Sequence, residues 1–178
     1  MARVLAAVML AWPTLIAAPT RPPSSQTMDS AQTASRRAAD EADLRRRIEG
    51  WAQAIGAMDL ERAMAIYAPD VVSFDLEPPL GYQGAEAKRQ AWSRVFALYR
   101  PGLSYEIRDL VITVGEDVAF SHGFNRLRGT LKSGQQTGSW VRHTACFRKI
   151  GGEWRIAHEQ ISAPVDPASG RAFLELQP

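Results

Sequence analysis

Four consecutive β-strands fill the second half of the chain, and this run constrains the fold more than any other feature. They are expected over residues 103–114, 118–131, 138–150 and 153–165. Short segments rich in glycine and polar residues separate them, which favours antiparallel hairpins. The strongest turn signal is Gly151 followed by Gly152, because two glycines accept the positive φ angles of a two-residue type I′ turn.

The first of these strands changes face in its middle. Its apolar residues occupy odd positions and then even ones: Leu103, Tyr105 and Ile107, then Leu110, Ile112 and Val114. Because strand side chains alternate with a period of two, the flip at Arg108 and Asp109 predicts a bulge or a sharp bend. The sheet is therefore expected to be curved.

Three helices are expected before the strands. The first begins near residue 39 and carries apolar residues at spacings of four and three, which mark one helical face: Leu44, Ile48, Trp51, Ile55 and Met58. Asp59 is the expected N-cap of a short second helix, which Pro69 ends. A third helix is expected over residues 85–99. The pattern predicts an α+β fold, in which a cone-shaped curved antiparallel sheet packs against about three N-terminal helices and leaves a conical pocket.

The first 20 residues have the layout of a secretory signal peptide. Arg3 is followed by an apolar run and then by small residues. The run is interrupted by Pro13 and is shorter than the roughly 20 apolar residues of a stable membrane span. We therefore expect a secreted or periplasmic protein; if translation starts at Met28 instead, the protein would be cytoplasmic.

One folded domain is expected, because 178 residues with 46% hydrophobic content leave room for one sizeable core. Residues 21–38 have almost no large apolar side chain, which predicts a disordered linker. The domain is expected over residues 39–165, and residues 166–178 are assigned to a C-terminal tail.

Charge and motifs disfavour several classes of function. The formal net charge is only +2 and no basic tract is present, so nucleic acid is not an expected partner. Cys146 is the one cysteine, which leaves no intramolecular disulfide or cysteine cluster for zinc. Three histidines and Asp75 lack metal-ligand spacing, so no metal or cofactor is expected. The chain has no Ser-His-Asp order, phosphate loop or dinucleotide fingerprint, which disfavours hydrolysis by a triad and nucleotide chemistry.

Four segments carry a resemblance to a known family: MDLERAMAIYAPDVVSFD, GYQGAEAKRQAW, ITVGEDVAFSHGFNR and WVRHTACFRKIGGEWRIAHEQIS. In their order and spacing, residues 44–164 resemble the SnoaL-like and ketosteroid-isomerase-like branch of the nuclear-transport-factor-2-like superfamily. The resemblance implies the cone-shaped α+β fold and a homodimer formed through the sheet. That superfamily includes isomerases, dehydratases, epoxide hydrolases, cyclases and non-catalytic proteins, so the resemblance implies no single reaction.

The resemblance also implies a role for Asp75. In ketosteroid isomerase the general base is an aspartate on the first strand, and Asp75 ends the matching strand VVSFD. The tyrosine and the protonated aspartic acid that assist that base align with Trp51 and approximately with Ala145, so steroid isomerisation itself is not expected. Considered without the resemblance, Asp75 is either a general base in an apolar pocket or a carboxylate that orders the following loop by accepting backbone hydrogen bonds.

Pairing Ile150 with Glu153 sets the expected register of the last hairpin. One face then carries two histidine-containing pairs: Ala145 with His158 and His143 with Gln160. The other face carries a polar cluster: Arg142, Thr144 and Glu159. The match of Ala145 to the aspartic acid in the pocket of ketosteroid isomerase favours the first face as the pocket wall. The run of Trp140, Arg142 and Thr144 on the other face favours the second.

His158 and Arg142 join Asp75 as candidate catalytic residues. A neutral His158 would relay a proton, although a histidine bonded to a backbone carbonyl accounts for it as well. Arg142 would orient a ligand carboxylate, or it pairs with Glu159. The residues expected to contact a ligand, several of which are equally explained as core, are Trp51, Tyr67, Trp92, His122, Trp140, Thr144 and Glu159.

Two functions follow from these features. The first is a small-molecule-binding protein in which Asp75 performs acid-base catalysis of isomerase, cyclase, dehydratase or hydrolase type on a small apolar cyclic or carbonyl compound. The second is a non-catalytic ligand-binding or dimerisation module of the same fold. A closed apolar pocket around Asp75 favours the first, whereas a carboxylate held by the loop favours the second.

Overall fold

The structure is a computed structural model, and it describes residues 25–178. Its helices and strands follow in this order: α1 (Ser25–Gly56), α2 (Leu60–Met64), β1 (Tyr67–Phe74), β2 (Tyr82–Gln83), α3 (Ala85–Leu98), β3 (Ser104–Val114), β4 (Val118–Thr130), β5 (Gln136–Thr137), β6 (Trp140–Ile150) and β7 (Glu153–Ser162). The expected signal peptide at residues 1–20 lies outside the described residues. Export, and the division into linker, domain and tail, stay predictions.

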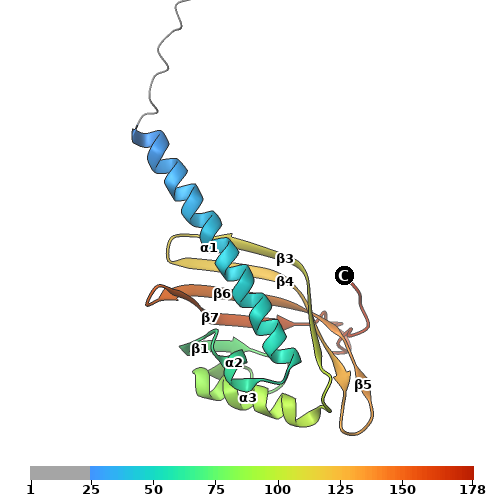
Figure 1. The fold of residues 1–178 in the computed structure, drawn as a ribbon. Helices are drawn as coiled ribbons and strands as arrows, with labels where there is room; N and C mark the ends of the chain where they lie inside the picture. The colour runs from blue at the N-terminus through green and yellow to red at the C-terminus, as the bar shows by residue number, and fades with distance from the viewer. Residues whose placement is uncertain (1–24) are drawn as a thin grey trace, which may run out of the picture.

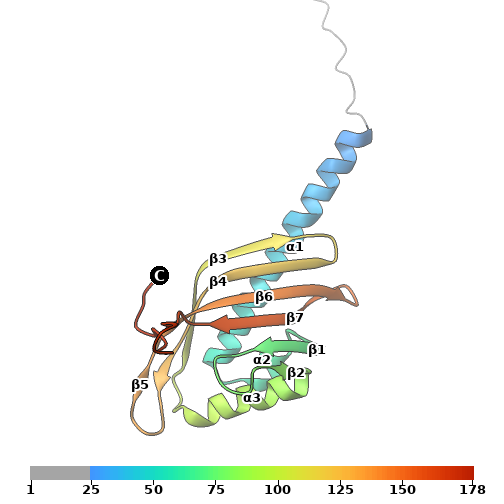
Figure 2. The same cartoon turned by 180° about the vertical axis from the view of Figure 1, so that it is seen from behind.

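The strands form one curved, seven-stranded sheet. Its order is β2-β1-β7-β6-β4-β3, and β5 pairs with β4. Neighbouring strands are antiparallel except for β1 and β7, which run parallel. Figures 1 and 2 show α1 crossing one face of the sheet and α3 lying below its β1 edge. The predicted α+β class with a curved sheet is confirmed; within that sheet β1 joins the last strand in parallel, which departs from the expected antiparallel pattern.

The inner side of α1 and the concave face of the sheet share one hydrophobic core. On α1 the buried residues fall at the predicted helical spacing: Leu44, Ile48, Trp51 and Ile55. The sheet contributes small and large apolar side chains opposite them: Ala145, Phe147, Trp154 and Ile156. The amphipathic first helix is confirmed, and its apolar stripe is what holds it on the sheet.

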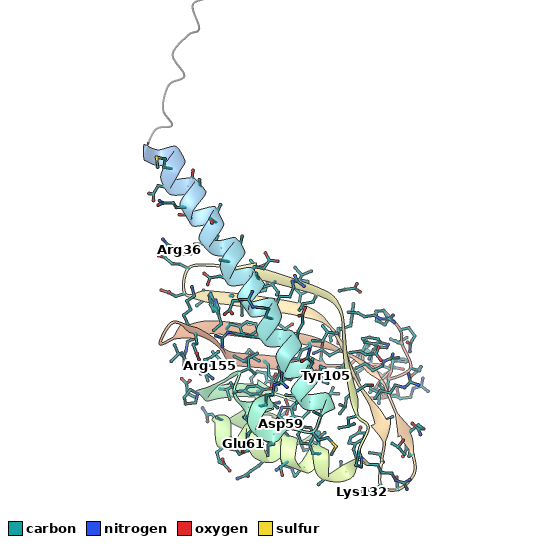
Figure 3. All side chains as sticks on the ribbon, in the orientation of Figure 1. Arg36, Asp59, Glu61, Tyr105, Lys132 and Arg155 are labelled. Atoms are coloured by element: carbon teal, nitrogen blue, oxygen red, sulfur yellow. The ribbon has the colours of Figure 1, made fainter. Side chains whose placement is uncertain are left out.

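α1 begins at Ser25, although a disordered linker was expected up to residue 38. Residues 28–39 are exposed, and Figure 3 shows Arg36 on the part of α1 that extends past the sheet. Residues 25–49 contain neither glycine nor proline and are rich in alanine and arginine, which have high helix propensity. The backbone therefore continues as a helix where no apolar face is buried.

Asp40 fastens α1 to the sheet at the point where the exposed part ends. Its Oδ2 accepts a hydrogen bond from Lys149 Nζ at 2.7 Å, and its Oδ1 accepts one from Trp154 Nε1 at 3.1 Å. Burial alone would raise the pKa of Asp40, but these two donors outweigh it and lower the pKa below the ordinary value. The carboxylate is therefore charged at neutral pH and ties the helix to β6 and β7.

Short α2 and the start of β1 follow α1. The Asp59 side chain accepts from the backbone N–H of Arg62 at 3.1 Å, which confirms Asp59 as the N-cap. α2 ends at Met64, before Pro69, which was expected to end it; Pro69 lies within β1 instead. None of the described helices combines the length and the apolar character needed to cross a membrane.

β3 bends where the change of face predicts it. Its register with β4 shifts between Arg108 and Val111, and Asp109 has a positive φ of 52°. Gly123 lies opposite the bend, and a Cβ added there would lie 2.9 Å from the Arg108 carbonyl oxygen. The bulge is confirmed, and it lets the sheet curl around the core.

The last hairpin forms as predicted near its turn but not further along. Gly151 and Gly152 have φ angles of 59° and 84°, which confirms the turn, and Phe147 pairs with Ile156 as expected. A register shift then leaves one residue of β7, Ala157, without a partner. Beyond the shift, each residue of β6 faces a β7 residue one position later than predicted. The predicted histidine pairs are wrong for this reason; the observed pairs are Ala145 with Glu159 and His143 with Ile161.

Candidate functional site

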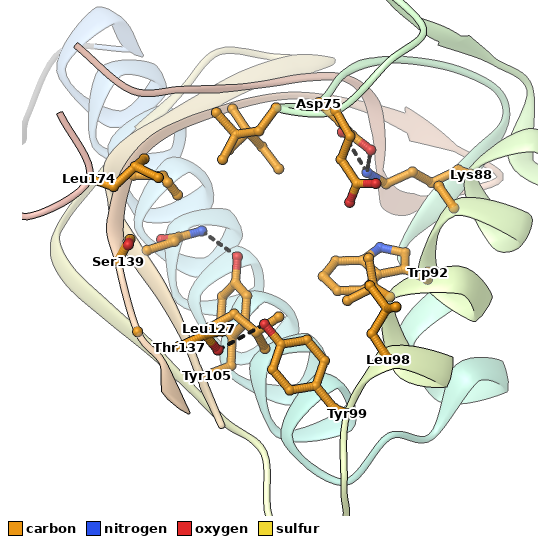
Figure 4. Close-up of a pocket in the computed structure, with 18 residues that line it drawn as sticks. Asp75, Lys88, Trp92, Leu98, Tyr99, Tyr105, Leu127, Thr137, Ser139 and Leu174 are labelled. Atoms are coloured by element: carbon orange, nitrogen blue, oxygen red, sulfur yellow. Dashed lines mark hydrogen bonds and ion pairs between the residues drawn. The ribbon is translucent and has the colours of Figure 1, made fainter. Parts of the chain in front are cut away.

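A cavity of about 300 Å³ opens between α3 and the concave face of the sheet. Figure 4 shows the side chains that point into it. Most of the lining is apolar, from α3, β3, β4, β6 and the C-terminal segment, where Leu174 contributes. Its volume is at the lower end of the range typical of ligand pockets. The fold thus provides an apolar chamber for a small molecule.

One wall of the cavity contains an ion-pair cluster centred on Lys88. Its Nζ lies 2.8 and 2.9 Å from the two carboxylate oxygens of Asp75, and 2.6 Å from Glu159 Oε1. The side chains of Lys88 and Glu159 are 2% and 1% exposed, whereas that of Asp75 is 13% exposed. Asp75 and Lys88 both line the cavity, and Asp75 is the more exposed of the two.

Lys88 is buried because of its position on α3. It precedes Trp92 by four residues, so both side chains lie on the helix face that covers the sheet. Burial alone would lower the pKa of Lys88, but the negative charges of Glu159 and Asp75 outweigh burial and raise it. The amine is therefore a fixed ammonium ion at neutral pH and not a free nucleophile.

Glu159 lies behind Asp75 and is fully buried. Its Oε2 is 3.2 Å from His143 Nε2 and accepts from Tyr67 Oη at 3.4 Å. Burial alone would raise the pKa of Glu159, but Lys88 and the hydrogen bond from His143 hold the pKa well below its ordinary range. Glu159 is therefore ionised, and His143 Nε2 serves as the donor of their shared hydrogen bond.

Ser73 joins the two carboxylates. Its Oγ lies 2.5 Å from Asp75 Oδ1 and 3.0 Å from Glu159 Oε1, and it accepts from Lys88 Nζ at 3.0 Å. A hydroxyl has one proton, so Ser73 donates to only one carboxylate at a time. The three N–H bonds of Lys88 are directed at Asp75, Glu159 and Ser73, which fixes the ammonium in place.

Tyr67 and Trp92 form the next layer. Trp92 Nε1 donates to Tyr67 Oη at 3.2 Å, and Tyr67 in turn donates to Glu159. Burial and the charge of Glu159 raise the pKa of Tyr67 well above its ordinary value, so its hydroxyl remains protonated. Both rings also lie within 6 Å of Lys88 Nζ, at 5.8 and 5.5 Å from the centroids of Tyr67 and Trp92.

The structure brings together only part of the predicted site. Asp75 and Trp92 line the cavity, while Tyr67 and Glu159 support them from behind. Trp51 is buried in the core and stacks on His143 at 5.9 Å. These residues occupy the concave side of the sheet.

The other predicted site residues lie on the convex side of the sheet: His122, Trp140, Arg142, Thr144 and His158. The ring of His158 is 2.9 Å from the Val72 carbonyl oxygen through Nδ1. The unpaired Ala157 explains this placement, since one extra residue exchanges the faces of all later β7 side chains. The same shift brings Glu159 inward, away from Arg142.

Four polar residues of the site were missed: Ser73, Lys88, Tyr105 and Asn125. For Lys88 a signal existed, because a lysine in phase with the apolar face of a helix needs a buried partner. Asn125 is in phase with the buried Ala119 and Ser121 of β4. Ser73 and Tyr105 gave no signal, because serine and tyrosine are common on strand faces of either kind.

The arrangement suits proton transfer. A carboxylate whose position is fixed by an ammonium ion borders an apolar chamber, where a proton on a bound molecule is within reach of Asp75 Oδ. Among residues 25–178, no three side chains of histidine, cysteine, aspartate or glutamate are grouped as a metal site would require.

Comparison with known proteins identifies the family and the fold. The profile of the SnoaL-like domain family matches residues 44–166. An NTF2-like protein of unknown function from Pseudomonas putida KT2440 is 30% identical, with a TM-score of 0.73 over 79% of this chain and 98% of that chain. The search of curated proteins yields no match.

Two further solved structures show the same fold at lower identity. A ketosteroid isomerase-like protein from Erwinia carotovora atroseptica SCRI1043 is 22% identical, with a TM-score of 0.58 over 69% of this chain and 96% of that chain. A protein with a cystatin-like fold from Nostoc punctiforme PCC 73102 is 19% identical, with a TM-score of 0.59 over 74% of this chain and 94% of that chain. At these identities the likeness concerns the fold alone.

Proposed function

Because the chain belongs to the SnoaL-like domain family, we propose that it binds a small, largely apolar molecule in the cavity and that Asp75 moves a proton on that molecule. The observation that carries this proposal is the Asp75 carboxylate at the wall of an apolar chamber, held by Lys88 at 2.8 Å. An ionised carboxylate next to an apolar space has few water molecules to compete with a bound substrate. No cofactor is needed for such a step.

The reaction that fits is the removal of a proton from carbon next to a carbonyl group. An Asp75 oxygen takes the proton, the C–H electron pair forms a carbon–carbon double bond, and the carbonyl π electrons move to the oxygen, which gains the negative charge. Return of the proton to another carbon gives an isomerase, and loss of a leaving group gives a dehydratase. The substrate is a small cyclic or carbonyl compound.

The other residues of the cluster position Asp75. Lys88 fixes the Asp75 carboxylate. Glu159 pairs with the same ammonium ion from the interior side. Tyr67 and Trp92 fix Glu159 in turn. We assign no role in the cavity to His158 and Arg142, because their side chains lie on the convex side of the sheet.

Exchange of carbon-bound protons tests the proposal without knowledge of the natural substrate. The probe is 2-tetralone, a small cyclic ketone, whose α-protons exchange with deuterium in D₂O and are followed by NMR. We expect the protein to accelerate exchange over buffer and Asp75→Asn to lose about 100-fold of that acceleration. Glu77→Gln is the matched control, since Glu77 also lines the cavity but takes no part in the cluster. Equal loss in both variants would contradict the role of Asp75.

A second function is favoured by one observation. Both oxygens of Asp75 already accept hydrogen bonds, from Lys88 and from Ser73, as in a carboxylate that serves structure alone. On this reading the protein is a ligand-binding module without catalysis. Binding of 2-tetralone, detected by the fluorescence of Trp92, without any acceleration of exchange would establish this second function.

We also propose that two copies associate through the convex face of the sheet. Large apolar side chains are exposed there: Phe74, Val111, Val118 and Phe120. Several large exposed apolar side chains on one sheet face favour association. The family resemblance implies the same face.

A further inference from the structure

The wall of the cavity that faces Asp75 carries a second polar pair, Tyr105 on β3 and Asn125 on β4. Asn125 Nδ2 donates a hydrogen bond to Tyr105 Oη at 2.9 Å. Figure 4 shows the hydroxyl end of Tyr105 directed into the open space, across from Asp75 and Lys88. A molecule in the cavity therefore has the carboxylate on one side and this hydroxyl on the other.

The hydroxyl proton of Tyr105 is not used by any described residue. The Oη atom accepts from Asn125, and no described residue accepts from it. Tyr99, which also lines the cavity, differs: Thr137 donates to the Gly129 carbonyl oxygen, so the Tyr99 hydroxyl must donate to Thr137 Oγ1 at 2.9 Å. The contrast leaves Tyr105 with a donor directed at the cavity contents.

Tyr105 is also held in one position and kept protonated. Its ring packs edge to face on Trp51, with 4.9 Å between the centroids and 74° between the planes. Burial raises the pKa of Tyr105 far above its ordinary value. A donated hydrogen bond from Asn125 also polarises the hydroxyl, which strengthens its own donation.

We propose that Tyr105 donates a hydrogen bond to the carbonyl oxygen of the bound molecule, and that the substrate class is therefore a ketone or enone. This inference rests on the proposed function, because it orients the carbonyl so that the adjacent carbon faces Asp75. Trp51 then has a positioning role: it holds the ring whose hydroxyl binds the ligand. The group that polarises the substrate oxygen is therefore Tyr105.

The step balances with these groups alone. Asp75 takes the proton from carbon, and the C–H electron pair becomes the new double bond. The carbonyl π electrons move to oxygen, and that oxygen accepts a stronger hydrogen bond from Tyr105, which keeps its own proton. Reprotonation at carbon by Asp75 reverses the electron flow.

Tyr105→Phe tests the inference, with Tyr99→Phe as the matched control. The probe is 2-tetralone labelled with carbon-13 at the carbonyl, whose bound NMR signal moves downfield when a donor contacts the oxygen. We expect this shift in the wild type and in Tyr99→Phe and its loss in Tyr105→Phe. Affinity for the ketone should fall about tenfold in Tyr105→Phe, and the exchange rate about 100-fold. Affinity for tetralin, which lacks the oxygen, should stay unchanged and shows that the cavity is intact.

The outcomes separate this inference from the proposed function. If the downfield shift persists in Tyr105→Phe while Asp75→Asn still abolishes exchange, the inference is overturned and the proposed function stands. If the wild type binds the ketone but does not accelerate exchange, and the shift still depends on Tyr105, the donor is supported and catalysis fails. If the wild type does not bind the ketone, both are overturned.

Discussion

Glu159 is charged inside the protein because four groups surround its carboxylate: Lys88, Ser73, His143 and Tyr67. Its pKa is lower in the folded than in the unfolded chain, so acidification adds more protons to the unfolded state. The stability due to this group is therefore complete above its ordinary pKa of 4.5 and is lost as the pH falls below that value. The raised pKa of Lys88 has the opposite sign, and its contribution is lost only at alkaline pH.

Glu159→Gln should remove this pH dependence. The amide keeps the shape but leaves the buried ammonium with one carboxylate, so we expect a loss of about 3 kcal/mol in the free energy of unfolding at pH 7. The difference from wild type should shrink toward pH 3, as measured by urea unfolding across that range. Glu153→Gln is the control, because this exposed pair with Arg155 should contribute at most about 1 kcal/mol. A difference that stays constant with pH would contradict the assignment of charge to Glu159.

At the scale of single residues, the sequence predicted the carboxylate at the cavity but not the lysine that holds it. Asp75 was found through the family resemblance, which fixes its place at the end of the first strand. Lys88 was missed, although its spacing of four residues from Trp92 places both on the same face of α3. Tyr105 and Asn125 meet because β3 and β4 pair side by side, and the local pattern of either strand does not encode that contact.

Two glycines on different elements should respond oppositely to the same substitution. Gly123→Ala should lower the free energy of unfolding by about 1–3 kcal/mol, because the new Cβ would lie 2.9 Å from the Arg108 carbonyl oxygen at the bend of β3. Gly50→Ala, within α1, should raise it by about 0.5–1 kcal/mol, since nothing lies within 4 Å of the added Cβ. Urea midpoints of the two variants give the comparison. Equal effects of the two substitutions would mean that the backbone at the bend of β3 shifts to accommodate the new Cβ.

The elements show where patterning works and where it does not. The bulge in β3 was predicted from the change of apolar phase. β7 shows the same change of phase, because its inward residues switch from even positions such as Ile156 to odd positions such as Ile161. The register of β7 was nevertheless predicted without a bulge. The two-residue strands β2 and β5 carry no periodicity and were not predicted.

For the whole molecule, association through the convex face predicts a concentration-dependent dimer. Phe120→Asp should yield a monomer with unchanged secondary structure, since this side chain is 45% exposed and points away from the core. Sedimentation equilibrium at micromolar concentrations measures the mass. Leu80→Asp is the matched control, because Leu80 is 98% exposed outside the sheet. A wild type that sediments as a monomer at every concentration would disprove the dimer.

The overall architecture was the most predictable level, because helix periods, strand phases and the family resemblance agree on one α+β cone. The early start of α1 could not be predicted, because a segment without an apolar face gives no signal that separates an exposed helix from a coil. Helix propensity alone decides there.

The parallel pairing of β1 with β7 sets the order in which the protein can fold. Val72 faces His158 and Ser73 faces Glu159, so this contact joins segments more than 80 residues apart in the chain. Closing so long a loop costs entropy before any contact offsets it, and folding slows as contact order rises. Lys88 can meet Asp75 early, within a stretch of 13 residues. Its second carboxylate comes from the last strand, so we expect the charge cluster to be completed late in folding.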